Sequence, residues 1–256
     1  MASLAVALGA ELLKIRRTLM LMLALLSPLL VGVLEVAVSW ERVRSGVAPY
    51  DGSWVNQAQT MMLLWNLMLL PLLIPLQTAL LAGVEHSSRG WKRLFATPVP
   101  RWTVYMAKLI VSMGLFGLSM VLLDVTIVLA GMLLNAMAPA LGLTFDTIPW
   151  RVLLEATARA YLASWLLIAL HTWIACRWPS FVLAMGVGIA ATAAGMVVWS
   201  SDYGLYYPWT IPWLTSHAAY QEGGHLVSLT IGCLGAVPIA LLGCWDVTHR
   251  DALGAL

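Results

Sequence analysis

The chain has 256 residues, of which 61% are hydrophobic and 10% are charged, and its mean hydropathy is +0.86. Soluble domains carry roughly 25% charged residues, so this composition excludes a soluble globular protein with an ordinary water-facing surface. The formal net charge of +2 gives no indication of a nucleic-acid partner. We therefore expect an all-α integral membrane protein, a single transmembrane domain over residues 1–256 built from apolar segments of ~20 residues each.

Residues 2–16 predict an amphipathic helix that lies on the membrane surface before the first span. Apolar side chains recur at helical spacing at Leu4, Leu8, Leu12 and Ile15. The charged residues of this segment fall on other faces, at Glu11, Lys14 and Arg16. A secretory signal peptide is not indicated, because its basic residues precede the apolar stretch, whereas here they follow it.

Six apolar segments predict transmembrane helices, at residues 18–39, 59–84, 102–136, 150–176, 181–199 and 225–245. Pro71 and Pro75 interrupt the second, which membrane helices accept when neighbouring groups satisfy the freed carbonyls. The third is longer than the bilayer requires, so we expect it to tilt or to project. Residues 200–224 combine aromatic side chains with Pro208 and Pro212. We expect a re-entrant segment on the outer side, with an aromatic-rich external loop as the alternative.

The distribution of lysine and arginine predicts the orientation. With a cytoplasmic N-terminus, the cytoplasmic side holds Lys14, Arg16, Arg17, Arg89, Lys92, Arg93, Arg101, Lys108, Arg177 and Arg250. The other side holds Arg42, Arg44, Arg151 and Arg159. Cytoplasmic loops are enriched in positive charge, so we expect both termini in the cytoplasm of a multi-pass protein in the cell (inner) membrane, with lipid as a partner.

A polar connection follows the second span, and residues 87–97 predict a short cytoplasmic helix within it. Its apolar face would carry Trp91, Leu94 and Phe95, flanked by basic residues. Prolines at positions 98 and 100 end it, because proline cannot continue the hydrogen-bond ladder. Two interpretations stay open: the helix rests at the lipid interface, or it inserts into a groove of a soluble partner.

Catalytic motifs are missing from the sequence. No lysine follows a glycine-rich turn as in a P-loop, and neither GxSxG nor HExxH occurs. The five histidines have no metal-ligand spacing. We therefore expect no enzymatic activity, no metal and no cofactor for this chain by itself.

The connection resembles that of ABC-2 type permeases. The resemblance rests on Glu85 at the end of the second span, Arg-Gly-Trp-Lys at 89–92, Thr-Pro-Val-Pro-Arg at 97–101, and Lys108 in the third span. It is closest to the small six-span branch of lantibiotic-immunity and bacitracin-type export permeases. The resemblance implies a coupling helix that docks a separate ATP-binding cassette ATPase, which holds ATP and Mg. The implied coupling residues are Glu85, Arg89, Trp91, Lys92, Arg93, Leu94 and Phe95.

The same resemblance implies a second permease subunit, as a homodimer or a related heterodimer. It also implies export of a hydrophobic or amphipathic substrate such as a peptide antibiotic, a drug or a lipid. The alternative function is an ion-coupled secondary transporter that uses Asp124, Glu35 and His171, since ionisable residues inside a membrane are functional hypotheses by default.

Polar residues inside the spans are candidates for the substrate path: Asp124, Asn66, Glu35, Arg151, Glu155 and Arg159. Asp124 is either functional or a packing carboxyl bonded to Asn66 or to Thr126 of a neighbouring copy. Glu35 is expected to reach water or to pair with an arginine of the fourth span. The four-residue spacing of 151, 155 and 159 permits Glu155 to bridge both arginines, as a vestibule or as an interfacial stripe.

Overall fold

The structure is a computed structural model that describes residues 2–16, 18–46, 53–87, 99–220 and 226–249. Every regular element in these ranges is a helix. Six helices are long and apolar enough to cross a membrane: Leu19–Arg44, Trp54–His86, Arg101–Met137, Trp150–Arg177, Phe181–Val198 and Leu226–His249. The prediction of an all-α protein with six membrane helices is therefore confirmed.

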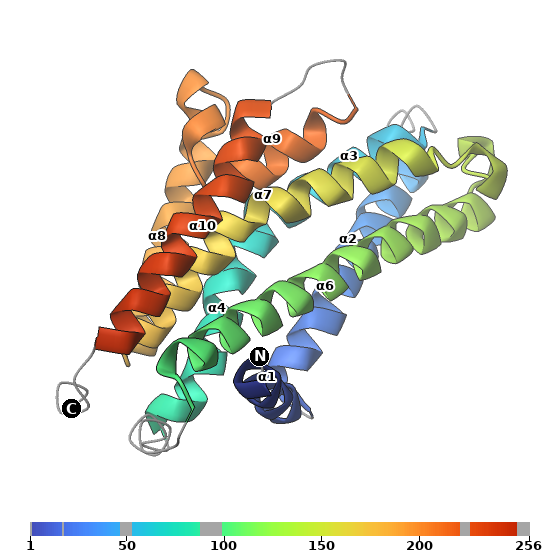
Figure 1. Ribbon diagram of the computed structural model, residues 1–256. Coiled ribbons are helices and arrows are strands. Elements are labelled where there is room, and N and C mark those ends of the chain that lie inside the picture. The colour runs from blue at the N-terminus through green and yellow to red at the C-terminus, as the bar shows by residue number, and fades with distance from the viewer. Residues whose placement is uncertain (1, 17, 47–52, 88–98, 221–225, 250–256) are drawn as a thin grey trace.

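The six spans correspond to labelled elements in Figure 1. They are α2 (Leu19–Arg44), α3 (Trp54–Leu63) with a π-helix (Leu64–Leu69) and α4 (Leu70–Ser87), α6 (Arg101–Met137), α7 (Trp150–Arg177), α8 (Phe181–Val198) and α10 (Leu226–His249). A helix before the first span is α1 (Ala2–Ile15), and a short helix between α8 and α10 is α9 (Ile211–His217). Of the predicted coupling helix at 87–97, only Ser87, the last residue of α4, lies within the described residues.

The second span begins earlier than its hydropathy indicates, because tertiary contacts stabilise a polar first turn. Trp54 packs on α6 so closely that a Cβ on Gly131 would lie 2.3 Å from its ring. Gln57 Nε2 donates to the carbonyl oxygen of Ile127 on α6, at 3.4 Å. The π-helix (Leu64–Leu69) directly follows α3. Such irregular turns are frequent at functional sites.

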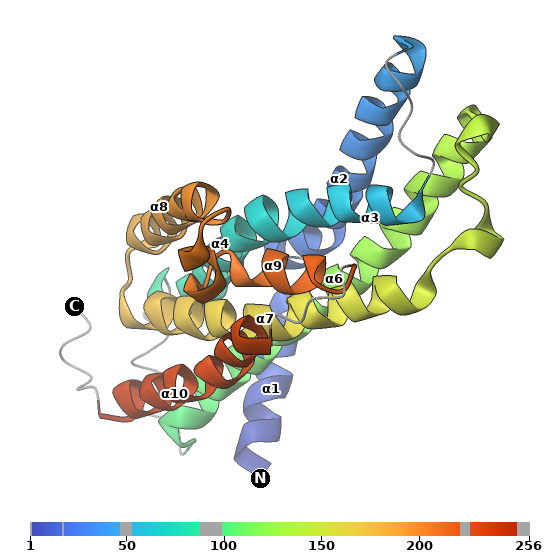
Figure 2. The same cartoon turned by 90° about the horizontal axis from the view of Figure 1, so that it is seen from above.

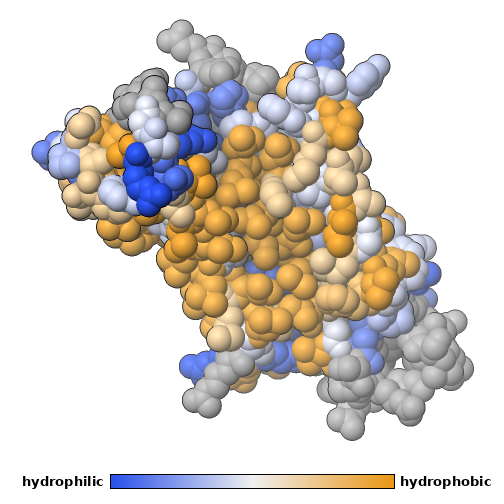
Figure 3. All heavy atoms as spheres, turned by 180° about the vertical axis from the view of Figure 1, so that it is seen from behind, coloured by the Kyte–Doolittle hydropathy of each residue, from blue (hydrophilic) through white to orange (hydrophobic). Residues whose placement is uncertain are grey.

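The spans alternate in direction, so the molecule has two distinct ends. Figure 1 shows α1 at one end and α9 at the other. The α1 end also holds the end of α4, the start of α6, the end of α7 and the end of α10. A broad apolar belt lies between more polar ends in Figure 3, as expected of a surface whose middle faces lipid.

Helix α7 is central, packing against α4, α6, α9 and α10, and Figure 2 shows it between α4 and α10. The α7–α10 contact is close because of Gly232, where a Cβ would meet the backbone of Ala163 at 2.5 Å. At the α1 end, Arg177 of α7 forms an ion pair with Asp246 of α10 at 3.1 Å. Close backbone approach at small residues is how membrane helices associate.

Helix α2 contains Pro28, which removes the hydrogen bond that the carbonyl of Ala24 would otherwise accept. Ser119 of α6 supplies the missing donor, with its Oγ at 2.9 Å from the Ala24 oxygen. The proline is thus tolerated because a neighbouring helix satisfies the freed group.

The connection between α8 and α10 contains a 3-10 helix (Asp202–Tyr206) and α9. Helix α9 packs on α7 and buries Ile211, Trp213 and Ser216. Ser216 accepts a hydrogen bond from Asn66 Nδ2 at 3.1 Å. This connection is therefore packed into the α9 end of the bundle rather than extended away from it.

Candidate functional site

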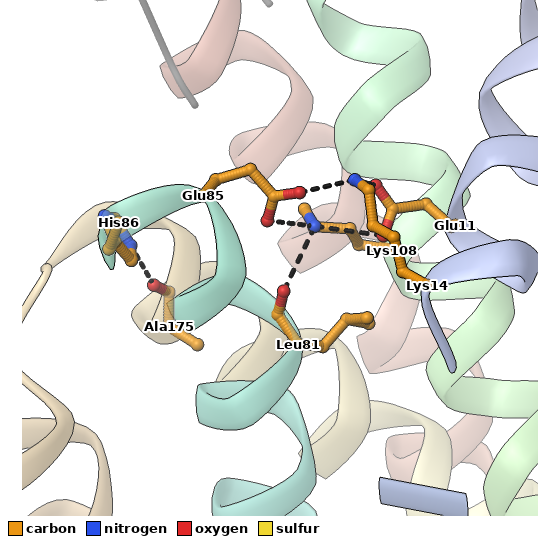
Figure 4. A network of polar contacts seen from close by, with 7 residues as sticks. All are labelled: Glu11, Lys14, Leu81, Glu85, His86, Lys108 and Ala175. Carbon is orange, nitrogen blue, oxygen red and sulfur yellow. Dashed lines mark hydrogen bonds and ion pairs between the residues drawn. The ribbon is translucent and has the colours of Figure 1, made fainter. Parts of the chain in front are cut away.

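Four charged side chains meet at the α1 end, and we call them the charge quartet: Glu11, Lys14, Glu85 and Lys108. Figure 4 shows them pointing toward one another from α1, α4 and α6. Lys108 Nζ donates to Glu85 Oε2 at 2.5 Å and to Glu11 Oε2 at 3.1 Å. Lys14 Nζ donates to Glu11 Oε1 at 2.7 Å and to Glu85 Oε1 at 2.5 Å. Each lysine thus contacts both glutamates.

Three members of the charge quartet are buried, and Lys14, whose side chain is 28% exposed, lies at its edge. Glu11 and Glu85 are buried and Lys108 is only 1% exposed, and the third donor direction of Lys108 is satisfied by the Leu81 carbonyl at 3.2 Å. Two positive and two negative groups sum to zero charge. Buried ion pairs require good geometry and satisfied hydrogen bonds to offset their desolvation, and this cluster provides both.

Lys14 lies on α1, outside the spans. Partial burial lowers its pKa, but hydrogen bonds and charge attraction from Glu11 and Glu85 outweigh this, so the pKa of Lys14 is raised above its ordinary value. Its ammonium therefore remains charged at neutral pH, as the pairing requires.

The charge quartet is attached to both ends of the connection between the second and third spans. Glu85 lies in the last turn of α4, and Lys108 lies about 10 Å along α6 from its first residue, Arg101. Beside Glu85, His86 Nε2 contacts the Ala175 carbonyl of α7 at 2.9 Å. The helices that flank residues 88–98 are thus tied to each other and to α1.

Of the predicted coupling residues, the structure describes Glu85 alone. The others lie outside the described residues: Arg89, Trp91, Lys92, Arg93, Leu94 and Phe95. Three members of the charge quartet were not predicted as site residues. A signal did exist for them: Glu11 and Lys14 are three residues apart, and Lys108 stands inside a long apolar run.

The predicted substrate-path residues are dispersed rather than gathered. Asp124 of α6 is buried and accepts a hydrogen bond from Thr157 of α7, with 2.6 Å between Oγ1 and Oδ1. The predicted hydrogen bond between Asp124 and Asn66 is wrong, because the Asn66 amide donates to Ser216 instead. Thr126 donates to the Leu122 carbonyl of its own helix, at 2.7 Å. A sequence cannot reveal which helix faces Asp124, so the partner on α7 was missed.

Two further expectations are corrected. Glu35 does not pair with an arginine of α7 in the described part of the chain; it accepts from Ser39 Oγ on its own helix, at 2.9 Å. Glu155 pairs with Arg159, whereas Arg151 is an exposed residue at the start of α7 with no ion pair among the described residues. The three side chains therefore do not form the predicted bridge.

His171, named for the ion-coupled alternative, is buried in α7. Its ring meets that of Trp209 edge-on at 5.8 Å. Neither ring nitrogen has a hydrogen-bond partner within the described ranges, so His171 is joined neither to Asp124 nor to Glu35 there.

The sequence of the chain matches a known family. The profile of a family described as "ABC-2 family transporter protein" matches residues 7–195. That range includes most of α1, the charge quartet and all of the first four spans. No curated protein and no solved structure matches the chain. The chain belongs to the ABC-2 family of transporter proteins.

Proposed function

We propose that this permease of an ABC transporter is moved by a separate ATP-binding cassette ATPase, which docks on residues 89–95 and supplies bound ATP and Mg. The observation that carries the proposal is the charge quartet. It fixes both helices that flank the proposed docking segment, through Glu85 on α4 and Lys108 on α6. A force that the ATPase applies to residues 89–95 would therefore reach α4 and α6 together, because the charge quartet links the two helices.

The α1 end is then the cytoplasmic end, and both termini lie in the cytoplasm of a cell (inner) membrane protein. The excess of lysine and arginine on this side supports that orientation. A cytoplasmic α1 end would also place the ATPase there, because ATP is found in the cytoplasm.

A second permease subunit, identical or related, would complete the translocation path. Export of a hydrophobic or amphipathic molecule, such as a peptide antibiotic, a drug or a lipid, fits spans with few internal charges. The family match favours this ATP-driven permease over an ion-coupled carrier. The separation of Asp124, Glu35 and His171 agrees, since a proton relay needs its groups within hydrogen-bonding reach.

The test is association of the ATPase with two variants, Trp91→Ala and Arg93→Glu. We expect either change to reduce co-purification of the ATPase at least tenfold, because aromatic and arginine anchors dominate interface energies. Membrane insertion should be unchanged. Trp178→Ala and Arg16→Glu are matched controls, since both residues are exposed at the same end of the molecule. Unchanged co-purification with both test variants would falsify the proposed docking segment.

A further inference from the structure

Asp124 of α6 is a buried carboxyl group with a single hydrogen-bond partner among the described residues. It is 8% exposed, and Thr157 Oγ1 of α7 donates to its Oδ1 at 2.6 Å. Its neighbours on the same helix are apolar and buried: Met120, Leu123 and Ile127. Within the described ranges, no basic side chain forms an ion pair with it. Such a carboxylate is costly to bury unless a positive group compensates it.

A tyrosine from the connection between α8 and α10 approaches this carboxyl. Tyr220 lies three residues beyond the end of α9, a helix that Figure 2 shows between α3 and α7. Its hydroxyl donates to Met62 Sδ of α3 at 3.4 Å. Burial raises the pKa of Tyr220 above its ordinary value, and the nearby negative charge of Asp124 raises it further. The phenol is therefore neutral at pH 7, and its ring is of the kind that attracts cations.

The amide of Gln57 on α3 approaches α6 from the same side as Asp124. Its Nε2 donates to the carbonyl oxygen of Ile127, three residues after Asp124, at 3.4 Å. Its Oε1 would lie 2.7 Å from a Cβ on Gly131, seven residues after Asp124. Positions three and seven apart share one face of a helix. Gln57 is 3% exposed, and its Oε1 has no hydrogen-bond partner in the part of the chain that the structure describes.

The groups around Asp124 are therefore rich in acceptors and poor in donors. The acceptors are the carboxylate of Asp124, the amide oxygen of Gln57, the phenol oxygen of Tyr220 and the thioether of Met62. The two hydroxyl donors are already engaged, that of Thr157 with Asp124 and that of Tyr220 with Met62. A primary ammonium group has the opposite character, with three N–H donors, a positive charge and no acceptor. Its hydrogen bonds to a carboxylate are of the strong, charge-assisted kind.

From this arrangement we propose that Asp124 binds the primary ammonium group of an amphipathic molecule that the permease exports. The inference rests on the proposed function and adds that the exported molecule is positively charged. Thr157 orients the carboxylate through Oδ1, while Oδ2 is the oxygen that faces the ligand. Tyr220 is half-buried, so the site borders the surface at the α9 end, opposite the charge quartet.

The experiment measures binding of radiolabelled n-octylamine by equilibrium dialysis. The full chain is purified in phosphatidylcholine nanodiscs, and binding to empty nanodiscs is subtracted. Octylamine is protonated at neutral pH, like a lysine side chain, and n-octanol has the same alkyl chain without the charge. Asp124→Asn removes the charge but keeps an oxygen that accepts from Thr157. Asp146→Asn is the matched control, because Asp146 is an exposed aspartate between α6 and α7.

We expect saturable octylamine binding to the unchanged chain, and binding weaker by about tenfold or more in Asp124→Asn, because a charge-assisted contact is lost. Asp146→Asn should bind octylamine as the unchanged chain does, and octanol should bind all three proteins alike. The inference is overturned if the unchanged chain shows no saturable binding, or if Asp124→Asn binds octylamine normally. Equal weakening by Asp146→Asn, or an equal loss of octanol binding in Asp124→Asn, overturns it as well. No ATPase is present in this measurement, so its result is independent of the docking test at Trp91 and Arg93.

Discussion

Two sites with buried carboxyl groups lie in opposite halves of this molecule, and they differ in the partners of those carboxyl groups. At the α1 end, the charge quartet joins two carboxylates and two ammonium groups from α1, α4 and α6. Toward the α9 end, Asp124 of α6 meets only the hydroxyl of Thr157 on α7. No oppositely charged side chain pairs with Asp124 among the described residues.

The charge quartet is thus a set of ion pairs between three helices, whereas Asp124 and Thr157 share a single hydrogen bond. Removing one charge from a buried, balanced cluster leaves a charge uncompensated, which is strongly destabilising. Removing one partner of a single hydrogen bond leaves only an unsatisfied polar group. The α1 end should therefore tolerate change far less than the Asp124 site, although Asp124 is buried just as Glu11, Glu85 and Lys108 are.

The largest effect is expected for Lys108→Met, which leaves Glu11 and Glu85 with Lys14 alone. We expect the free energy of unfolding to fall by about 3–5 kcal/mol, as for other broken buried ion pairs. Titration from a mild detergent into a denaturing one, followed by circular dichroism, measures this change.

The double variant Lys108→Met with Glu85→Gln is the control, because it removes one charge of each sign. The glutamine oxygen can still accept from Lys14, which lies at 2.5 Å from Glu85 Oε1. We expect the double variant to recover most of the stability lost in the single one. A double variant as unstable as Lys108→Met would mean that packing, and not charge balance, sets the loss.

A smaller effect is expected at the Asp124 site. Thr157→Val removes the one hydrogen-bond donor to Asp124 Oδ1 in the described part of the chain and should lower the unfolding free energy by about 1–3 kcal/mol. Asp124→Asn keeps an oxygen that accepts from Thr157, so it should cost less than about 1 kcal/mol. The same detergent titration compares the two. The reverse order would indicate that the Asp124 charge itself stabilises the fold.

Hydropathy was enough to predict the six spans, since each is an apolar run long enough to cross the bilayer. The pairing within the charge quartet could not be predicted, because its contacts join residues 71 and 97 positions apart, from Lys14 to Glu85 and from Glu11 to Lys108. Such pairing depends on helix packing, which local pattern does not encode. The same limit explains the wrong partner Asn66 for Asp124, because the sequence does not show which helices face each other, whereas the four-residue spacing within one helix correctly gave the Glu155–Arg159 pair.

The smallest effect is expected for Glu155→Gln, at an ion pair that is not enclosed. Glu155 and Arg159 have side chains 39% and 28% exposed, and exposed pairs contribute about 0.2–1 kcal/mol. Their attraction is also screened by salt, since the Debye length falls from about 10 Å at 0.1 M to about 3 Å at 1 M. We therefore expect the effect of Glu155→Gln to vanish in 1 M salt, whereas that of Lys108→Met persists. A Lys108→Met effect that disappeared with salt would mean that water and ions reach Lys108, and the contrast between a buried and an exposed charge site would be lost.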